Sequence, residues 1–338
     1  MIQGRVNPQP TNQRKGHIMP LDLVTQNHVS EIRDGWQFEH HDPFNLDLFK
    51  EKAVFEKVPV LADVDGLISN LDGFSAIYNR ATDSVVSMRP VANSYQLVPH
   101  EKMLEAQADQ LANSPLSNQR LRVVDRLFEH GKKAHRTIYF DDMTAEVKSR
   151  AGSDSVIPRL DVFNSVDMSW AFQVFSGAYR DLCRNTLVFG GEKAYHQKKK
   201  HTRNLDTASL TGKAVLSLDM FTGQRELMDA WAKTSLSENQ FREMLEDSIC
   251  SRPARPSDVE GEKPVNRGLL DYLLYQYRDE AHELGETLWA GYNALTHWAT
   301  HTLETPRAKN TQKQHDTQRQ RNDMVRQVIA GDAWQVAA

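Results

Sequence analysis

The separation of strand-type from helix-type sequence constrains this fold more than any other feature. Extended, β-rich runs dominate residues 73–205, which contain one clear helix, whereas residues 206–303 carry apolar side chains at spacings of three and four. Strands and helices therefore do not alternate along the chain as they do in a parallel α/β protein. This order predicts an α+β fold: an antiparallel sheet built from hairpins and packed with one helix, followed by a helical C-terminal part.

Two hairpins are expected in the strand-rich part. The first joins residues 74–78 to 84–89 through a polar turn, and the second joins 119–129 to 134–140 through a turn that contains Gly131. Pro99 suits the first turn of a helix that runs to residue 113. In the helical part, Ser237 and Gln240 have the spacing of a capping box.

The remaining segments differ in composition from these two parts. Residues 1–21 are polar and almost free of apolar side chains, so we expect a disordered leader. Residues 22–72 form an acidic N-terminal segment, with nine Asp or Glu against four Lys or Arg between residues 31 and 65, and we expect loops and short elements there. Residues 304–338 form a basic, Gln-rich tail that could serve as a flexible arm.

Composition excludes several classes of protein. No run approaches the ~18 apolar residues that a membrane span needs, the N-terminus lacks the apolar core of a signal peptide, and the mean hydropathy is −0.60. Two cysteines cannot build a disulfide framework, so we expect a cytoplasmic protein without membrane contact. The net charge is −4, so any case for nucleic-acid binding must come from local basic patches.

Two such patches occur, about sixty residues apart. Arg120, Arg122 and Arg126 share parity and would lie on one face of a regular strand. The predicted nucleic-acid-binding residues are Arg120, Arg122, Arg126, Lys132, Lys133, Arg136 and Tyr139 of the second hairpin, with Tyr195, Lys198, Lys199, Lys200, His201 and Arg203 of the second patch. Lysine and arginine would follow phosphates, and Tyr139 or Tyr195 would stack on unpaired bases. Solvated, lysine-coated sheet edges are the alternative explanation.

Catalytic signals are weak by comparison. His297 and His301 share a helix face but lack further ligands, and Cys183 has arginine neighbours but no assignable base. The acids Asp141, Asp142, Asp161 and Asp167 could bind magnesium, which leaves a metal-dependent nuclease as a less favoured alternative. Both phosphate-binding glycine motifs are absent. We therefore expect no catalytic residue, no metal and no cofactor.

Four short stretches resemble a family of uncharacterised phage and plasmid proteins of the YfjQ/YafZ type. They are Arg89-Pro-Val-Ala-Asn-Ser-Tyr-Gln-Leu-Val-Pro-His100, Cys183-Arg-Asn-Thr-Leu187, Lys200-His-Thr202 and Thr287-Leu-Trp-Ala-Gly-Tyr-Asn-Ala-Leu-Thr296. Thr186 stands where that family usually has glycine. The resemblance implies a mobile-element protein in a bacterial host cytoplasm and assigns no catalytic residue. The expected layout is also similar, as a fold-level analogy, to Rad52-type single-strand annealing proteins.

These observations predict a non-enzymatic DNA-binding protein of a phage or plasmid, which prefers single strands and acts in replication or recombination. Host or phage replication proteins are the expected protein partners, and a homo-oligomer is left open. The main alternative is a protein that modulates a host factor through its acidic segment, residues 31–65.

Overall fold

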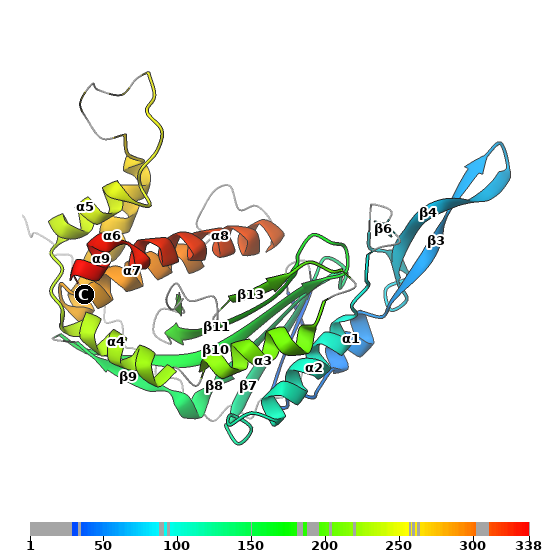
Figure 1. Ribbon diagram of the computed structural model, residues 1–338, viewed down its shortest axis with the longest axis horizontal. Coiled ribbons are helices and arrows are strands. Elements are labelled where there is room, and N and C mark those ends of the chain that lie inside the picture. Colours follow the sequence, from blue (N-terminus) through cyan, green and yellow to red (C-terminus); the bar gives the residue numbers. More distant parts are fainter. Residues whose placement is uncertain are drawn as a thin grey trace, which may run out of the picture.

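Figure 1 shows the architecture of the chain as a computed structural model. The structure describes residues 29–32, 35–87, 91–92, 95–149, 151–180, 185–187, 196–202, 205–218, 221–256, 258, 261, 264–301 and 311–337. The predicted leader, together with Cys183, Tyr195 and Arg203, lies outside the described residues. No helix in the described part of the chain has the length and apolar character needed to cross a bilayer.

An antiparallel sheet forms the centre of the molecule, and its described part has nine strands. The main path is β1 (Val29–Ile32), β2 (Gly35–His40), β7 (Leu121–Phe128), β8 (Lys133–Phe140), β10 (Ser153–Ser165), β11 (Phe172–Arg180) and β12 (Asn185–Leu187). Strand β9 (Ala145–Lys148) also pairs with β10, and β13 (His196–Lys199) also pairs with β11. The predicted second hairpin is β7 and β8, joined at Gly131, which has a φ of +82°.

Helices cover one face of this sheet. Helix α2 (His100–Ala112) and helix α3 (Thr207–Leu218) lie beneath it in Figure 1, with the short α1 (Asp47–Lys52) beside them. Alternate strand residues such as Val123, Ile138 and Leu160 point towards these helices and are fully buried. This face is an ordinary apolar core between a sheet and two helices.

The C-terminal part is a helical unit whose apolar core also includes Ala145, Val147, Val156 and Ala178 of the main sheet. It comprises α4 (Phe221–Lys233), α5 (Glu238–Asp247), α6 (Arg267–Leu284), α7 (Leu288–Thr300), α8 (Thr311–Ala330) and α9 (Asp332–Ala337). The capping box at Ser237 and Gln240 is present at the start of α5, as predicted. The described part of the basic tail is helical rather than a flexible arm, because Val325, Ile329 and Trp334 are buried among the other helices.

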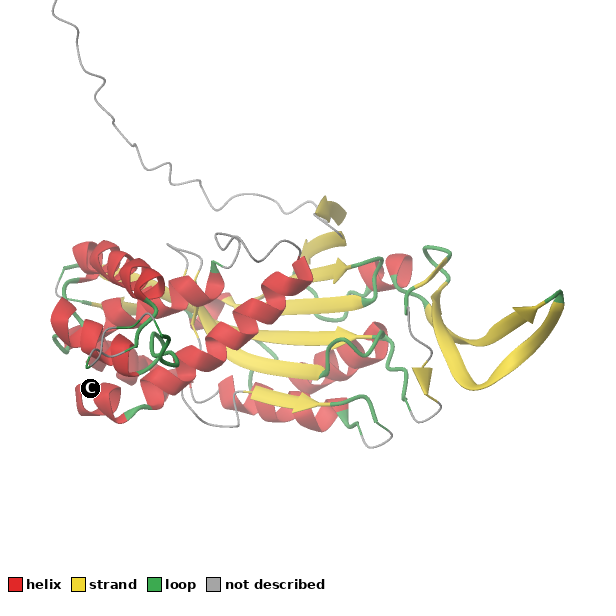
Figure 2. Ribbon diagram, turned by 90° about the horizontal axis from the view of Figure 1, so that it is seen from above, coloured by secondary structure: helices red, strands yellow, loops and turns green. Residues whose placement is uncertain are grey.

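A second sheet projects from the body (Figures 1 and 2). Its strands are β3 (Phe55–Val64), β4 (Leu67–Asn79), β5 (Ser84–Val85) and β6 (Val91–Ala92). The predicted first hairpin exists as the short β4–β5 pair, but the long partner of β4 is β3. We expected only loops and short elements in residues 22–72, so this ten-residue strand is a correction. The reason is the turn Asp65–Gly66, whose φ values of +53° and +82° suit a tight hairpin.

Short elements in the rest of the acidic segment belong to the main sheet or lie beside it. Strands β1 and β2 extend the sheet, and α1 packs near α2, so the acids of residues 31–65 are spread over two sheets and a helix. With an antiparallel sheet, helices on one face and a helical C-terminal part, the protein is α+β as predicted.

Candidate functional site

The second face of the main sheet is polar and aromatic. Strand register determines which side chains share this face, since directly paired residues point to the same side of a sheet. One row across the strands consists of Gln37, Arg126, His135, Phe163, Gln173 and Lys198. The next two rows contain Glu39, Val124, Thr137, Asp161 and Phe175, and then Arg122, Tyr139 and Arg159. We call these three rows the polar face.

Helix α8 lies over the side of the sheet that carries the polar face, opposite α2 and α3 (Figure 1). The guanidinium of Arg326, on α8, sits 5.7 Å from the ring centre of Phe175. It also forms an ion pair with Asp323 at 2.6 Å. The polar face therefore has a helix with a cationic side chain along part of it.

A buried carboxylate organises the middle of the polar face. Asp161 accepts hydrogen bonds from His135 at 2.8 Å and Thr137 at 2.9 Å, and Nε of Arg159 lies 2.7 Å from its second oxygen. Burial acts to raise the pKa of Asp161, but Arg159 and the two hydrogen bonds outweigh it and hold the pKa well below its usual range. Asp161 is therefore a fixed anion, fully engaged by its neighbours.

Arg126, unlike Asp161, is hydrogen-bonded only to neutral groups among the contacts that the described residues show. Its guanidinium donates to Oε1 of Gln37 at 2.9 Å and to Oγ1 of Thr137 at 3.3 Å, and both acceptors are neutral. Within the described residues, no carboxylate lies at ion-pairing distance from Arg126. Desolvation by burial lowers the pKa of this half-buried guanidinium, yet an arginine remains protonated. Arg126 is thus a partly dehydrated cation without a counter-charge in direct contact.

Aromatic rings line the polar face beside these charges. The rings of His135 and Phe163 stack with centres 4.1 Å apart, and Phe163 meets Phe175 and Trp170 edge-on at 5.6 and 5.9 Å. Phe163 and Phe175 keep part of their surface exposed. Arg122 lies over the ring of Tyr139, 4.1 Å from its centre. Cations and half-exposed rings thus lie on one surface.

The fold brings together part of the predicted nucleic-acid-binding set. Arg122, Arg126 and Tyr139 share the polar face with Lys198, although about sixty residues separate the two patches in the chain. Lys198, Lys199 and Lys200 are exposed. Tyr139 is largely buried, at 6% exposure, so its ring serves Arg122 rather than an incoming base.

Other predicted residues lie elsewhere, and their place in an open phosphate-binding surface must be corrected. Arg136 points into the opposite, helix-covered face and is buried against Asp125 at 2.7 Å, while Lys133 is buried against Glu129 at 2.7 Å. Such paired, buried charges cannot reach a phosphate without unfolding their surroundings.

Three more predicted residues lie outside the three rows of the polar face, although the side chain of Arg120 stays exposed. Lys132 pairs with Glu129 in the β7–β8 turn, and Arg120 precedes β7 with its guanidinium 3.5 Å from Asp142. His201 is buried and stacks on Tyr95, and burial lowers its pKa to about 4. A neutral, buried imidazole adds nothing to a positive surface.

Several residues of the polar face were not predicted from the sequence. Arg159, Phe163 and Phe175 come from strands that we identified only as extended runs. A signal was present: Leu160 and Val162 alternate with Arg159, Asp161 and Phe163, so the apolar pair marks the core side and the others mark the second face.

The described contacts of His135 on the polar face differ from those of a catalytic relay. Nε2 of His135 contacts both Asp161 and Thr137, whereas a relay needs one ring nitrogen for the carboxylate and the other for the hydroxyl. Across the described residues, no group of three His, Cys, Asp or Glu side chains could hold a metal ion. Asp141 and Asp142 instead face Arg122 and Arg120 at 3.6 and 3.5 Å.

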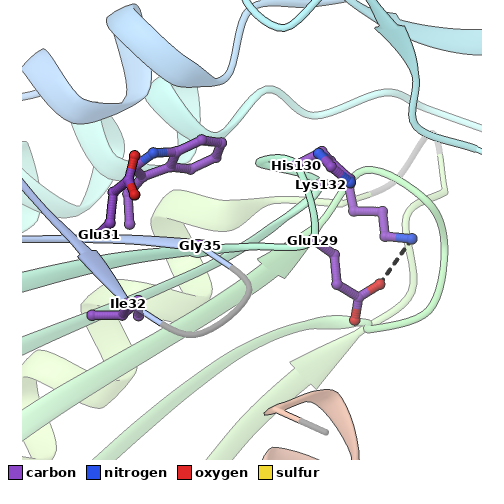
Figure 3. Close-up of a pocket in the computed structure, with 7 residues that line it drawn as sticks. Glu31, Ile32, Gly35, Glu129, His130 and Lys132 are labelled. Carbon is purple, nitrogen blue, oxygen red and sulfur yellow. Dashed lines mark ion pairs between the residues drawn. The ribbon is translucent and has the colours of Figure 1, made fainter.

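A separate cavity of about 560 Å³ lies between the β1–β2 hairpin and the β7–β8 turn (Figure 3). It is lined by Glu31, Ile32, Gly35, Trp36, Glu129, His130 and Lys132. The one lysine there forms an ion pair with Glu129 at 2.8 Å, which leaves the carboxylate of Glu31 to set the charge of the cavity. This composition does not suit a phosphate ligand.

In comparisons with known proteins, the chain matches a family model. No match was found among curated proteins or among solved structures. The family model covers residues 88–325, which include β7, β8, β10, β11 and β13 of the polar face but not β3 or β4. The matched region is about 70% of the chain, and the chain therefore belongs to the family described as domain of unknown function (DUF932).

Proposed function

We propose that the protein binds nucleic acid, with single-stranded DNA favoured, through the polar face of its main sheet. The observation that carries the proposal is Arg126, a half-buried guanidinium whose direct acceptors, Gln37 and Thr137, are both neutral. A phosphate oxygen would supply the missing negative charge in surroundings that strengthen the interaction.

The charge balance of the polar face favours an anionic ligand. Its three rows carry the cations Arg122, Arg126, Arg159 and Lys198 against the carboxylates Glu39 and Asp161. Asp161 is already engaged by Arg159 and His135, and Arg122 lies 3.6 Å from Asp141, which leaves Arg126 and Lys198 against Glu39. The remaining excess of positive charge is the condition for phosphate contacts that release counterions.

The spacing and the aromatic rings favour a single strand over a duplex. Four strand steps separate Arg126 from Lys198, about 19 Å at the usual spacing of neighbouring strands. A stacked strand places five or six phosphates over that length at about 3.4 Å each. Phe163 and Phe175 lie on the polar face between these cations and keep exposed surface on which unpaired bases could stack.

A phage or plasmid setting, with a role in replication or recombination, belongs to the same proposal. It is supported by the four sequence stretches that resemble the YfjQ/YafZ-type proteins, two of which, at residues 200–202 and 287–296, lie in described parts of the family region. The family description assigns no activity. Binding to oligonucleotides is therefore the first property to measure.

The test is a titration of fluorescent single-stranded oligonucleotides over a series of salt concentrations. Lys198→Gln should weaken binding and lower the slope of log affinity against log salt by about 0.7, the value for one phosphate contact of a single strand. Arg126→Gln should have an effect at least as large, because it also leaves the polar face without its uncompensated cation.

Lys102→Gln provides the matched control. Lys102 is exposed on α2, on the opposite side of the sheet, so the same change of charge should leave binding unchanged. Absence of wild-type binding at roughly 50 mM salt, or an equal loss in the Lys102 and Lys198 variants, would refute the proposal. A duplex of equal length should bind more weakly than the single strand.

A further inference from the structure

Strand β13 carries a lysine of the polar face on a segment with little apolar surface to bury. Residues 196–202 read His-Gln-Lys-Lys-Lys-His-Thr, and the ladder to β11 spans residues 196–199. Lys198, Lys199 and Lys200 are exposed, and as neighbours of like charge they repel one another. A short strand of this composition should open readily from the sheet unless a further contact anchors it.

His201 provides such a contact. Among the described side chains of residues 197–202 it is the buried one, at 6% exposure, whereas Lys200 before it and Thr202 after it are exposed. Its ring stacks on that of Tyr95, with ring centres 5.6 Å apart and planes 18° from parallel. Stacked aromatic pairs gain stability beyond the area that they bury. The end of β13 is therefore attached to the body through this ring.

Tyr95 is itself fixed to the main sheet. It is 7% exposed, and its hydroxyl donates to the carbonyl of Val166 at 3.0 Å. Val166 directly follows β10, and β11 lies between β10 and β13 in the sheet. Lys57 of β3 donates to the carbonyl of Tyr95 and lies 5.5 Å from the centre of its ring. The contacts from Val166 through Tyr95 to His201 thus link β13 to β10 across the end of β11.

We propose that His201, stacked on Tyr95, is a positioning residue that holds β13 and its Lys198 on the polar face. The consequence for binding rests on the proposed function, because Lys198 is one of the cations assigned there to the ligand. His201 does not touch the ligand itself. It is buried, and burial lowers its pKa to about 4, so the ring is neutral at physiological pH. Any effect of changing His201 on binding must therefore pass through the strand.

The position of β13 matters because a lysine on a loose segment has to be ordered when it binds. Ordering backbone and side chain costs conformational entropy, which is subtracted from the free energy of the phosphate contact. With β13 in place, Lys198 already lies in one row with Arg126. Loss of the stack should therefore weaken binding although no charge of the polar face is removed.

Hydrogen exchange of the free protein tests the anchor without any ligand. His201→Ala should make the amides of residues 196–199 exchange at least roughly tenfold faster, while those of β8 and β10 keep their wild-type rates. His201→Phe keeps a ring on Tyr95 and should restore slow exchange. His282→Ala, which changes an exposed histidine on α6, is the matched control and should leave exchange of β13 unchanged. Equal exchange of β13 in His201→Ala and wild type would overturn the inference.

Oligonucleotide binding tests the consequence for the polar face. His201→Ala should weaken binding of the fluorescent single strand, and His201→Phe should restore it. Lys198→Gln should cost less affinity in the His201→Ala background than in the wild type, whereas Arg126→Gln, on β7, should cost the same in both. A change that only lowered global stability would not separate the lysine from the arginine in this way. Circular dichroism checks that each variant is folded.

The possible outcomes separate the two proposals. Absence of wild-type binding would refute the proposed function, and hydrogen exchange would still decide whether His201 holds β13. Wild-type binding with an equal cost of Lys198→Gln in both backgrounds would overturn the positioning role and leave the proposed function standing. A His201→Phe variant that behaves like His201→Ala in both measurements would overturn the stack on Tyr95 as the anchor.

Discussion

The buried arginine Arg136 offers the clearest test of which basic residues build the fold and which are free to bind a ligand. Its guanidinium donates to both oxygens of Asp125 at 2.7 and 2.8 Å and to the carbonyls of Pro43 and Asn45 at 2.7 and 2.8 Å. Arg136→Met keeps most of the side-chain length but removes all four hydrogen bonds. Of the side chains that the described residues place against Asp125, His40 at 2.9 Å would then remain.

Arg136→Met should lower the free energy of unfolding strongly, because it leaves the buried carboxylate of Asp125 without its ion-pair partner. Removing one partner of such a pair typically costs about 3–5 kcal/mol. Domains of ordinary size have an unfolding free energy of about 5–15 kcal/mol, so Arg136→Met should remove a substantial share of it. The double variant Asp125→Leu/Arg136→Met should recover part of this loss, because no buried charge then remains without its partner.

The loss of unfolding free energy in Arg136→Met should also depend on pH. In the wild type, burial acts to raise the pKa of Asp125, but Arg136 and His40 outweigh it and lower the pKa below its ordinary value. The ionised carboxyl therefore stabilises the fold above its unfolded pKa, and that stability is lost as pH falls through the lowered pKa. Without Arg136, burial dominates and protonation relieves the buried charge. The difference in unfolding free energy between wild type and Arg136→Met should accordingly be smaller near about pH 5 than near about pH 8.

Urea unfolding followed by circular dichroism measures these differences, and oligonucleotide binding is measured on the same samples under folded conditions. We expect Arg136→Met to lose stability while the folded fraction binds as wild type does. A loss below about 1 kcal/mol, combined with weakened binding, would refute the argument from burial. Arg136 would then belong to the interface after all.

Two further predictions concern the rest of the fold. Burial raises the pKa of Asp154 and of Glu280, which share Arg180 between the sheet and α6, so stability present below about pH 4.5 should be lost as pH rises through the raised values. Glu280→Gln should flatten that part of the pH profile in urea unfolding. Gly131→Ala should lower stability by more than about 1 kcal/mol, because φ is +82° and an added Cβ would lie 2.8 Å from the carbonyl oxygen of Lys52. Gly66→Ala at the tip of the β3–β4 hairpin, with the same φ and open space around it, should lower stability by less in the same urea measurement, because only the backbone strain remains.

Parity along the strands explains both the success and the failure of the sequence-based site. Arg122 and Arg126 were correctly expected on one face, because β7 is regular at those positions. Arg136 was grouped with them because it is basic and near in sequence. It shares parity with Ile138, which marks the apolar side of β8, so the alternation in that strand already indicated a core position.

The buried pairs were beyond the reach of sequence analysis for another reason. Arg136 meets the carbonyls of Pro43 and Asn45, more than ninety residues earlier in the chain, only because β2 pairs with β7. No local sequence pattern around Arg136 indicates that β2 will pair with β7 and bring these carbonyls to it. The β3–β4 hairpin, in contrast, has a local signal, because Asp65–Gly66 between two apolar runs is a typical hairpin turn.

The polar face is the strongest candidate site because the partial desolvation of Arg126 destabilises the folded protein in the absence of a ligand. A sheet covered by helices on one side could expose ordinary polar residues on the other, where each charge would be fully hydrated. Arg126 instead lies half-buried beside His135, and burial lowers its pKa. A partly dehydrated cation without a direct counter-charge destabilises the isolated protein, and an anionic ligand would reverse that cost on binding. The same reasoning predicts that Arg126→Gln stabilises the free protein in urea while weakening its affinity for oligonucleotides, an opposition that a purely structural arginine would not produce.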